Sequence, residues 1–235
     1  MKRILLAGII VVSAANAVQA QDVKGLFKEI TGASSSLSTD DVAKGLKEAL
    51  NVGVEKGTKK LSAVDGFFKD AAVKILLPPE AQKIEKTLRG MGLGSQVDDA
   101  ILSMNRAAED AAKSAAPIFV NAIKQMSIQD AWGILKAGDS SATKYLRTKT
   151  TAPLTTAFSP VINQSLAKVD ATKYWNTLVS TYNDIPFVHK VNSDLGAYVT
   201  DKALSGIFYQ VAQQELQIRK DPLARTSDLL KKVFQ

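Results

Sequence analysis

The apolar positions of this chain recur with the period of an α-helix along most of its length. One stripe has spacings of three or four residues and comprises Val42, Leu46, Leu50, Gly53, Gly57 and Leu61. The preceding residues, Ser38–Asp41, predict a helix start, because a hydroxyl can cap free amides and carboxylates suit the positive helix end. Gly53 and Gly57 lower helix propensity but would let a second helix come close.

A second stripe runs along an alanine-rich segment. Ser95–Asp98 at the start of this segment have the same capping pattern. Its members share one helical face: Ile101, Asn105, Ala108, Ala112, Ala115, Phe119, Ala122 and Met126. Pro117 interrupts the segment, so we expect this helix to be kinked or split in two.

Further helices are predicted at 80–89, 127–136, 140–169, 170–184, 194–219 and from about 226. Pro153 and Pro160 punctuate the 140–169 stretch, and 194–219 is predicted to be the longest clean helix. No stretch alternates with period two, and no internal repeat is found. The pattern predicts an all-α, single-domain, irregular multi-helix bundle with a long C-terminal helix and little or no strand.

The first twenty residues have the pattern of a secretory signal peptide. Met1–Arg3 is positive, Ile4–Ala15 is apolar and uncharged, and Ala17–Ala20 supplies small residues at the cleavage site. The apolar run is about a dozen residues, whereas a membrane span needs about twenty. We therefore expect export, cleavage near Ala20, and a soluble periplasmic protein with a polar lead-in (21–36) and a helical domain (37–235).

Composition narrows the function classes. The chain has no cysteine, which excludes disulfides, thiol nucleophiles and cysteine-ligated metals. Loss of Lys2 and Arg3 with the leader lowers the net charge from +7 to +5. Its lysines are scattered and aromatic residues are few, so nucleic-acid binding is not expected, although weak contact with an anionic membrane surface is compatible with this charge.

Motifs for metal, cofactor or nucleophilic chemistry are missing from the sequence. The single histidine, His189, lies in a segment predicted to be a loop and is interpreted as a surface residue. Gly90–Gly94 follows a predicted helix rather than a strand, which favours a linker over a phosphate-binding loop. We expect no metal, no cofactor and no catalytic triad.

Several polar residues fall where the helical stripes predict burial. Glu215 lies on a stripe whose other members are Leu204, Ile207, Phe208, Val211 and Ile218. A carboxylate buried alone costs several kcal/mol, so Glu215 needs a partner, for which Arg106, Arg219 and Arg225 are the candidates.

Five polar residues on two of the predicted helices also have a suggestive spacing. Asn105 lies on the alanine-rich stripe and is flanked by Arg106 and Glu109, while Asp194 and Tyr198 are one turn apart. These residues, with Glu215, indicate either a structural ion network that fixes helix register or a polar pocket for a ligand or a general acid.

Five segments resemble the bacterial domain-of-unknown-function family 4197: residues 45–50, 76–79, 104–109, 202–208 and 218–234. The resemblance extends from about Leu37 to Phe234 and implies an exported helical protein of bacteria with a double-membrane envelope. It carries no established activity. The polar positions that mark the family correspond to Asn105, Arg106, Glu109, Asp194, Tyr198, Glu215, Arg219 and Arg225.

The sequence favours a non-catalytic envelope protein that binds a partner protein or an amphipathic ligand in a groove between helices. One alternative is an enzyme in which Glu109 or Glu215 is the acid or base and arginines hold an anionic substrate. Another is a peripheral membrane protein that uses the lysines of the first helix, Lys44, Lys47, Lys56, Lys59 and Lys60.

Overall fold

The computed structural model describes residues 38–81, 85–86, 89–90, 92, 94–168, 175–176, 180, 183, 187, 190, 194–225 and 227–234. They belong to one compact unit, Leu37–Gln235. Their helices are α2 (Thr39–Ser62), α4 (Gly94–Ala112), α5 (Ala115–Gln125), α6 (Ile128–Lys136), α7 (Ser141–Lys168), α9 (Leu195–Lys220) and α10 (Asp228–Val233). Two 3-10 turns, η1 (Pro79–Ala81) and η2 (Pro222–Ala224), complete them, and the described residues contain no strand. The predicted all-α class is confirmed.

Two helices begin with capping boxes, and the first of them is the helix start that the sequence predicts at Ser38–Asp41. The Ser38 hydroxyl accepts the Asp41 amide hydrogen at 3.1 Å, and the Asp41 carboxylate accepts the Ser38 amide hydrogen at 3.3 Å. Ser127 and Asp130 make the same reciprocal pair at the start of α6. These contacts span three residues, so local sequence suffices to specify them.

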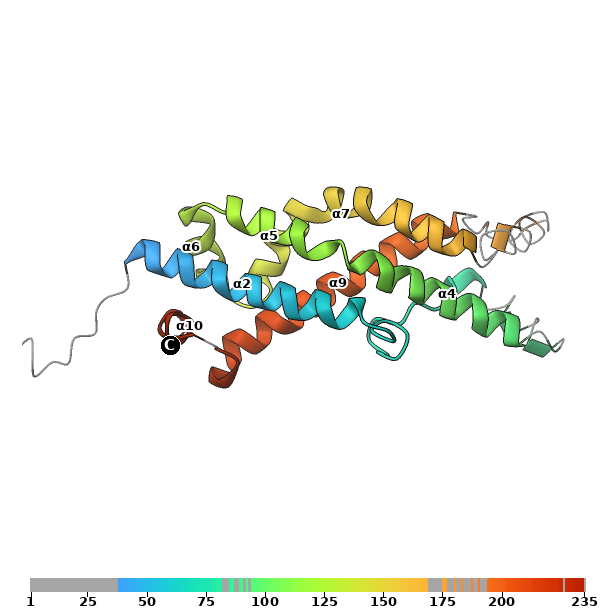
Figure 1. Ribbon diagram of the computed structural model, residues 1–235, viewed down its shortest axis with the longest axis horizontal. Coiled ribbons are helices and arrows are strands. Elements are labelled where there is room, and N and C mark those ends of the chain that lie inside the picture. The colour runs from blue at the N-terminus through green and yellow to red at the C-terminus, as the bar shows by residue number, and fades with distance from the viewer. Residues whose placement is uncertain are drawn as a thin grey trace, which may run out of the picture. The chain divides into compact units, whose positions relative to one another are not determined.

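Helix α2 lies against α9 and also contacts α4, α5, α6 and α10 (Figure 1). Its predicted stripe is buried throughout. A Cβ added at Gly53 would lie 3.3 Å from Cβ of Gln214, and one at Gly57 would lie 3.5 Å from Cβ of Gln210, both on α9. Both glycines therefore face α9, in agreement with the expectation that they let a second helix come close.

The alanine-rich segment is split into α4 and α5 by a turn at Lys113 and Ser114. Pro117 lies in the first turn of α5. Backbone amides in the first turn make no intrahelical hydrogen bond, so a proline costs the helix no bond at this position. The predicted cap at Ser95 is wrong, because α4 begins at Gly94 and the Ser95 hydroxyl bonds the side chain of Gln96 instead.

Helix α7 continues through both of its prolines, contrary to the predicted punctuation. Its buried stripe repeats every four residues: Leu146, Thr150, Leu154, Phe158, Ile162 and Leu166. Pro153 and Pro160 are exposed beside this stripe, and packing of the buried face outweighs the roughly 3 kcal/mol that an interior proline costs. At 28 residues α7 is also longer than α9, which has 26.

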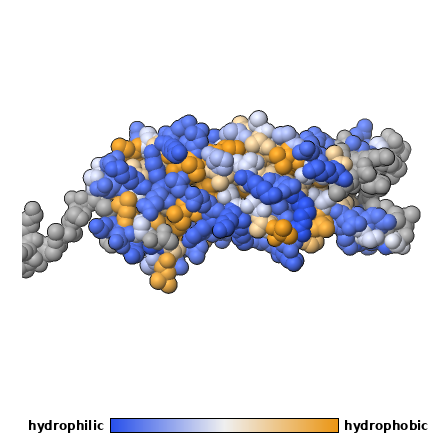
Figure 2. All heavy atoms as spheres, in the orientation of Figure 1, coloured by the Kyte–Doolittle hydropathy of each residue, from blue (hydrophilic) through white to orange (hydrophobic). Residues whose placement is uncertain are grey.

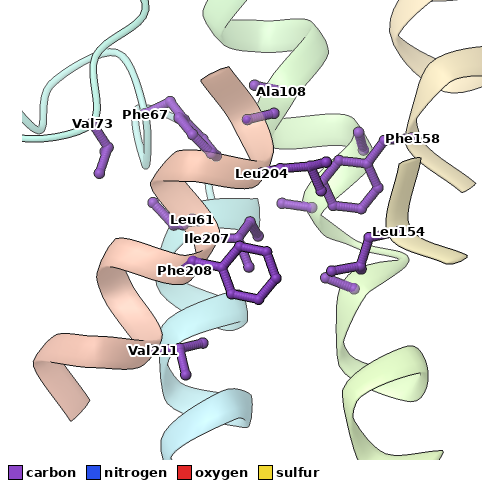
Figure 3. Packing of buried hydrophobic residues seen from close by; sticks show 14 of the residues in the cluster. Leu61, Phe67, Val73, Ala108, Leu154, Phe158, Leu204, Ile207, Phe208 and Val211 are labelled. Atoms are coloured by element: carbon purple, nitrogen blue, oxygen red, sulfur yellow. The ribbon is translucent and has the colours of Figure 1, made fainter. Parts of the chain in front are cut away.

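The main core lies where α9 meets α2, α4, α5 and α7. Phe208 of α9 lies among Leu61, Leu154 and Ile207 in Figure 3. Its ring meets that of Phe119 edge to face, with centroids 5.7 Å apart. Edge-to-face pairs of this kind favour one relative orientation of the two rings and stabilise the core beyond the burial of apolar area alone.

A smaller apolar cluster holds the C-terminal helix in place. It contains Ala49 of α2, Ile218 of α9 and Leu230 of α10, with Phe234 packed against it. Gly45 on α2 faces Val233, which explains how this short helix comes so near.

The visible face of the molecule is predominantly hydrophilic, with apolar residues scattered between the polar ones (Figure 2). Within the part of the chain that the structure describes, no helix has both the length and the apolar character needed to cross a membrane. Most of the predicted 170–184 helix, and part of the predicted 80–89 helix, lie outside the described residues.

Candidate functional site

Glu109 and Arg106 fix the start of the loop between α2 and η1, residues 63–78. The Glu109 side chain is 5% exposed, and its Oε1 accepts the amide hydrogens of Phe67 at 3.1 Å and Phe68 at 3.2 Å. Oε2 pairs with Nη1 of Arg106 at 2.6 Å, while Nη2 of Arg106 pairs with Oδ1 of Asp65 at 2.7 Å. Both partners, Glu109 foremost, raise the pKa of the Arg106 guanidinium.

Asn105 and Tyr198 hold the other end of the 63–78 loop. The fully buried Asn105 amide accepts the Ile75 amide hydrogen and donates to the Ile75 carbonyl, both at 2.8 Å. Tyr198 of α9 donates its hydroxyl to the Leu76 carbonyl at 2.9 Å. The loop lacks regular structure of its own, so these side chains replace the backbone partners that a helix or strand would provide.

Glu215 instead caps a helix from a distance. Its Oε1 accepts the amide hydrogen of Ala142 at 3.1 Å, and Oε2 accepts the amide and hydroxyl hydrogens of Thr143 at 2.9 and 2.7 Å. These amides lie in the first turn of α7, where intrahelical acceptors are missing and the helix dipole favours an anion.

The ion-pair partner of Glu215 is Arg219, one of the three candidates. Nε and Nη2 of Arg219 each lie 3.0 Å from Oε1 of Glu215. Nη2 also donates to the Ile134 carbonyl at 3.1 Å and the Ser141 hydroxyl at 2.9 Å. The pair thereby joins α9 to the junction between α6 and α7.

The other candidate partners of Glu215 have different roles. Arg106 binds Glu109 and Asp65, as described above. Arg225 donates to the carbonyls of Ile218 at 3.1 Å and Arg219 at 3.0 Å, and so covers the C-terminal end of α9. Asp194 is the N-cap of α9, where it accepts the Ala197 amide hydrogen at 2.8 Å.

The eight predicted residues therefore do not share one pocket. Asn105, Glu109 and Tyr198 each make hydrogen bonds to the 63–78 loop, whereas Glu215 makes hydrogen bonds to the start of α7 and to Arg219 on its own helix. Beside Glu215 the space amounts to a cavity of about 20 Å³, partly lined by Phe234. That is room for about one water molecule and not for a substrate.

A larger recess, which the sequence analysis missed, lies between α5 and α7, and we call it the α5–α7 groove. Its volume is about 510 Å³, within the usual range of ligand pockets. The lining residues come from these two helices and from the first turn of α6: Pro117, Ile118, Asn121, Ala122, Gln125, Asp130, Tyr145, Lys149, Thr150 and Pro153.

The local signal for the groove is a spacing of four residues on both helices. Pro117, Asn121 and Gln125 follow one line along α5, and Tyr145 and Lys149 begin the matching line on α7. Such polar lines are typical of any solvated helix face. They indicate a groove only once the two helices are known to lie side by side (Figure 1).

Three ionisable groups line the groove. Asp130 completes the α6 capping box, and the Ser127 hydroxyl and amide lower the pKa of its carboxyl. Burial, and secondarily the charge of Asp130, raises the pKa of Tyr145, so its phenol stays protonated. Nζ of Lys149 lies 5.8 Å from the centroid of the Tyr145 ring.

Metal chemistry finds no support among the described residues, which contain no group of three or more histidine or acidic side chains placed to hold an ion. His189, predicted to lie in a loop, falls outside them. The two buried carboxylates already bind backbone amides and an arginine each, an arrangement that suits a structural role.

The fold and these contacts define an all-α protein in which buried charged side chains hold a loop and a helix end. The chain belongs to the family described as "Protein of unknown function (DUF4197)", whose model matches residues 36–235. No curated protein and no solved structure matches it.

Proposed function

We propose that this DUF4197 protein is an exported, non-catalytic binding protein that holds a small amphipathic ligand in the α5–α7 groove. The groove itself carries the proposal, because it combines a volume of about 510 Å³ with apolar side chains and a few polar groups. The leader pattern of Met1–Ala20 supports export.

The lining of the groove suits an amphipathic molecule. Ile118, Ala122 and Pro153 offer apolar contact, while Tyr145 and Lys149 offer a hydroxyl and an ammonium group. Ile118, Ala122 and Tyr145 pack against the main core, so this wall of the groove is fixed by the fold. A pre-formed site loses less conformational entropy on binding than one that must be ordered.

The contacts of the buried carboxylates favour binding over catalysis. A general acid or base must reach the proton that it transfers, directly or through one water. Glu109 and Glu215 each accept hydrogen bonds from two backbone amides and pair with an arginine, and neither lines the groove. This supports the structural network over the acid–base alternative.

The lysines of α2 give less support to a membrane-surface role. Lys44 pairs with Asp40, Lys60 pairs with Asp70, and Lys47 donates to the Lys124 carbonyl. The carboxylates beside Lys44 and Lys60 offset part of the positive charge that these two lysines could offer to lipid headgroups.

A neutral fluorophore tests the groove directly. N-phenylnaphthylamine, which brightens in apolar surroundings, should bind the processed full-length protein. Ala122→Trp should abolish the signal by filling the groove. Ala152→Trp adds the same side chain at an exposed position of α7 outside the lining and should leave binding intact. Equal fluorescence in both variants would place the fluorophore elsewhere and refute the proposal, as would the absence of any signal.

A further inference from the structure

Asp130 and Lys149, the two charged side chains that line the α5–α7 groove, differ in the hydrogen bonds that they make. Oδ2 of Asp130 accepts the amide hydrogen of Ser127 at 3.0 Å and its hydroxyl hydrogen at 2.8 Å. Asp130 is also the third residue of α6, where the positive end of the helix dipole balances its charge. The Asp130 carboxylate is thus held at the start of α6 by these hydrogen bonds.

The Lys149 ammonium group, in contrast, is not held in an ion pair by any described carboxylate. Within the described part of the chain, no carboxylate lies within ion-pair distance of this group, although, after the Ser127 hydrogen bonds, its charge helps to lower the pKa of the Asp130 carboxyl. The centroid of the Tyr145 ring lies 5.8 Å from Nζ of Lys149. An ammonium group next to an apolar wall attracts an anion more strongly than the same group surrounded by water.

The neighbouring polar groups also include hydrogen-bond donors. The Tyr145 hydroxyl makes no hydrogen bond to another described residue, and the side-chain amides of Asn121 and Gln125 line the α5 side. The Gln125 amide also donates to Oδ1 of Asn121 at 3.5 Å. Hydroxyl and amide donors of this kind, like an ammonium group, can bind a carboxylate, sulfate or phosphate.

We infer that the ligand of the α5–α7 groove is an amphipathic anion, whose acid group lies beside Lys149 and whose apolar body lies against Ile118, Ala122 and Pro153. The inference rests on the proposed function of the groove and adds the sign of the ligand's charge. A single-chain carboxylate such as a fatty acid has this chemistry.

Three ligands with the same ten-carbon chain and different head groups test the charge. Decanoate, decanol and decyltrimethylammonium would each be titrated against the processed protein, with displacement of N-phenylnaphthylamine as the readout. Decanoate should bind about ten-fold more tightly than the cation, and added sodium chloride should reduce this preference. Tighter or equal binding of the cation would show that Asp130 sets the charge preference and would overturn the inference.

Lys149→Gln and Lys144→Gln form a matched pair, because both lysines are exposed on α7 and only Lys149 lines the groove. Lys149→Gln should remove the preference for decanoate over decyltrimethylammonium, while Lys144→Gln should keep it. If Lys149→Gln keeps the preference, the inference fails although the groove still binds amphiphiles. If no chain displaces the fluorophore, or Ala122→Trp has no effect, the groove itself is wrong.

Discussion

Glu215 of α9 caps the N-terminus of α7 by accepting the amide and hydroxyl hydrogens of Thr143, which lies 72 positions earlier in the chain. A helix start is usually satisfied by the residue immediately before it. Here Ser140 precedes α7 with a positive φ of 67°, and the cap is delivered by α9. The long-range carboxylate therefore makes the start of α7 depend on the packing of α9.

Glu215→Ala should lower the free energy of unfolding by about 3–5 kcal/mol, because it leaves the Arg219 guanidinium without its carboxylate partner and two amides of α7 without their acceptor. Chemical denaturation measures this, with Glu55→Ala on the exposed side of α2 as the control. A double-mutant cycle with Arg219→Ala should give a large coupling energy. If Glu215→Ala unfolds like Glu55→Ala, the capping role is wrong.

Asn105→Ala should lower the free energy of unfolding by about 1–3 kcal/mol, since it removes the hydrogen-bond partner of the buried amide and carbonyl of Ile75. Hydrogen exchange at the Ile75 amide should accelerate more than exchange at core helix amides. Ser103→Ala is the control, because the Ser103 hydroxyl bonds only the nearby Ala100 carbonyl. Unchanged exchange at Ile75 would contradict the role of Asn105 as a clamp for the 63–78 loop.

Asp70 should contribute to the acid sensitivity of the fold. Lys60, helped by the Ala72 amide and Gln210, holds the pKa of the Asp70 carboxyl below its ordinary value. The folded state thus releases this proton more readily than the unfolded chain. The resulting stability is fully present above the unfolded pKa of about 3.9 and is lost as pH falls through the lower folded value.

Asp70→Asn and Lys60→Met should therefore both flatten the loss of stability between about pH 4 and pH 2. Urea unfolding at several pH values provides the slopes. A wild-type slope in Lys60→Met would mean that the ion pair is not the source of the pH dependence.

Two glycine substitutions should act in opposite directions. A Cβ at Gly206 would lie 2.6 Å from Cε1 of Phe67, whose ring is fully buried, so Gly206→Ala should destabilise the fold by about 1–3 kcal/mol. Gly133 in α6 faces open space, so Gly133→Ala should stabilise the helix by up to about 1 kcal/mol. Thermal unfolding of the two variants checks the signs, and equal shifts would contradict the close packing of Phe67 on α9.

Processing is the remaining prediction. Intact-mass analysis of protein recovered from the periplasmic fraction should place the first residue at Gln21, because Ala17–Ala20 offers small residues to the signal peptidase. Recovery of membrane-bound protein that retains Met1 would show that the leader acts as an anchor instead.

The sequence by itself determined the features whose causes are local. The capping boxes at Ser38–Asp41 and Ser127–Asp130 span three residues, and the stripe on α2 follows from helical periodicity. The same periodicity placed Glu215 on a buried face, and its burial is confirmed. In each case one turn or one face of a helix contains the whole cause.

Only the tertiary structure decided what these residues meet. Glu215 finds Thr143 because α9 packs beside the start of α7, and no local pattern encodes that contact. Helix α7 continues through Pro153 because the adjoining face of the helix is buried along its length, which outweighs the local penalty. The α5–α7 groove is likewise a space between two packed helices, and its shape depends on how closely their side chains approach rather than on either helix alone.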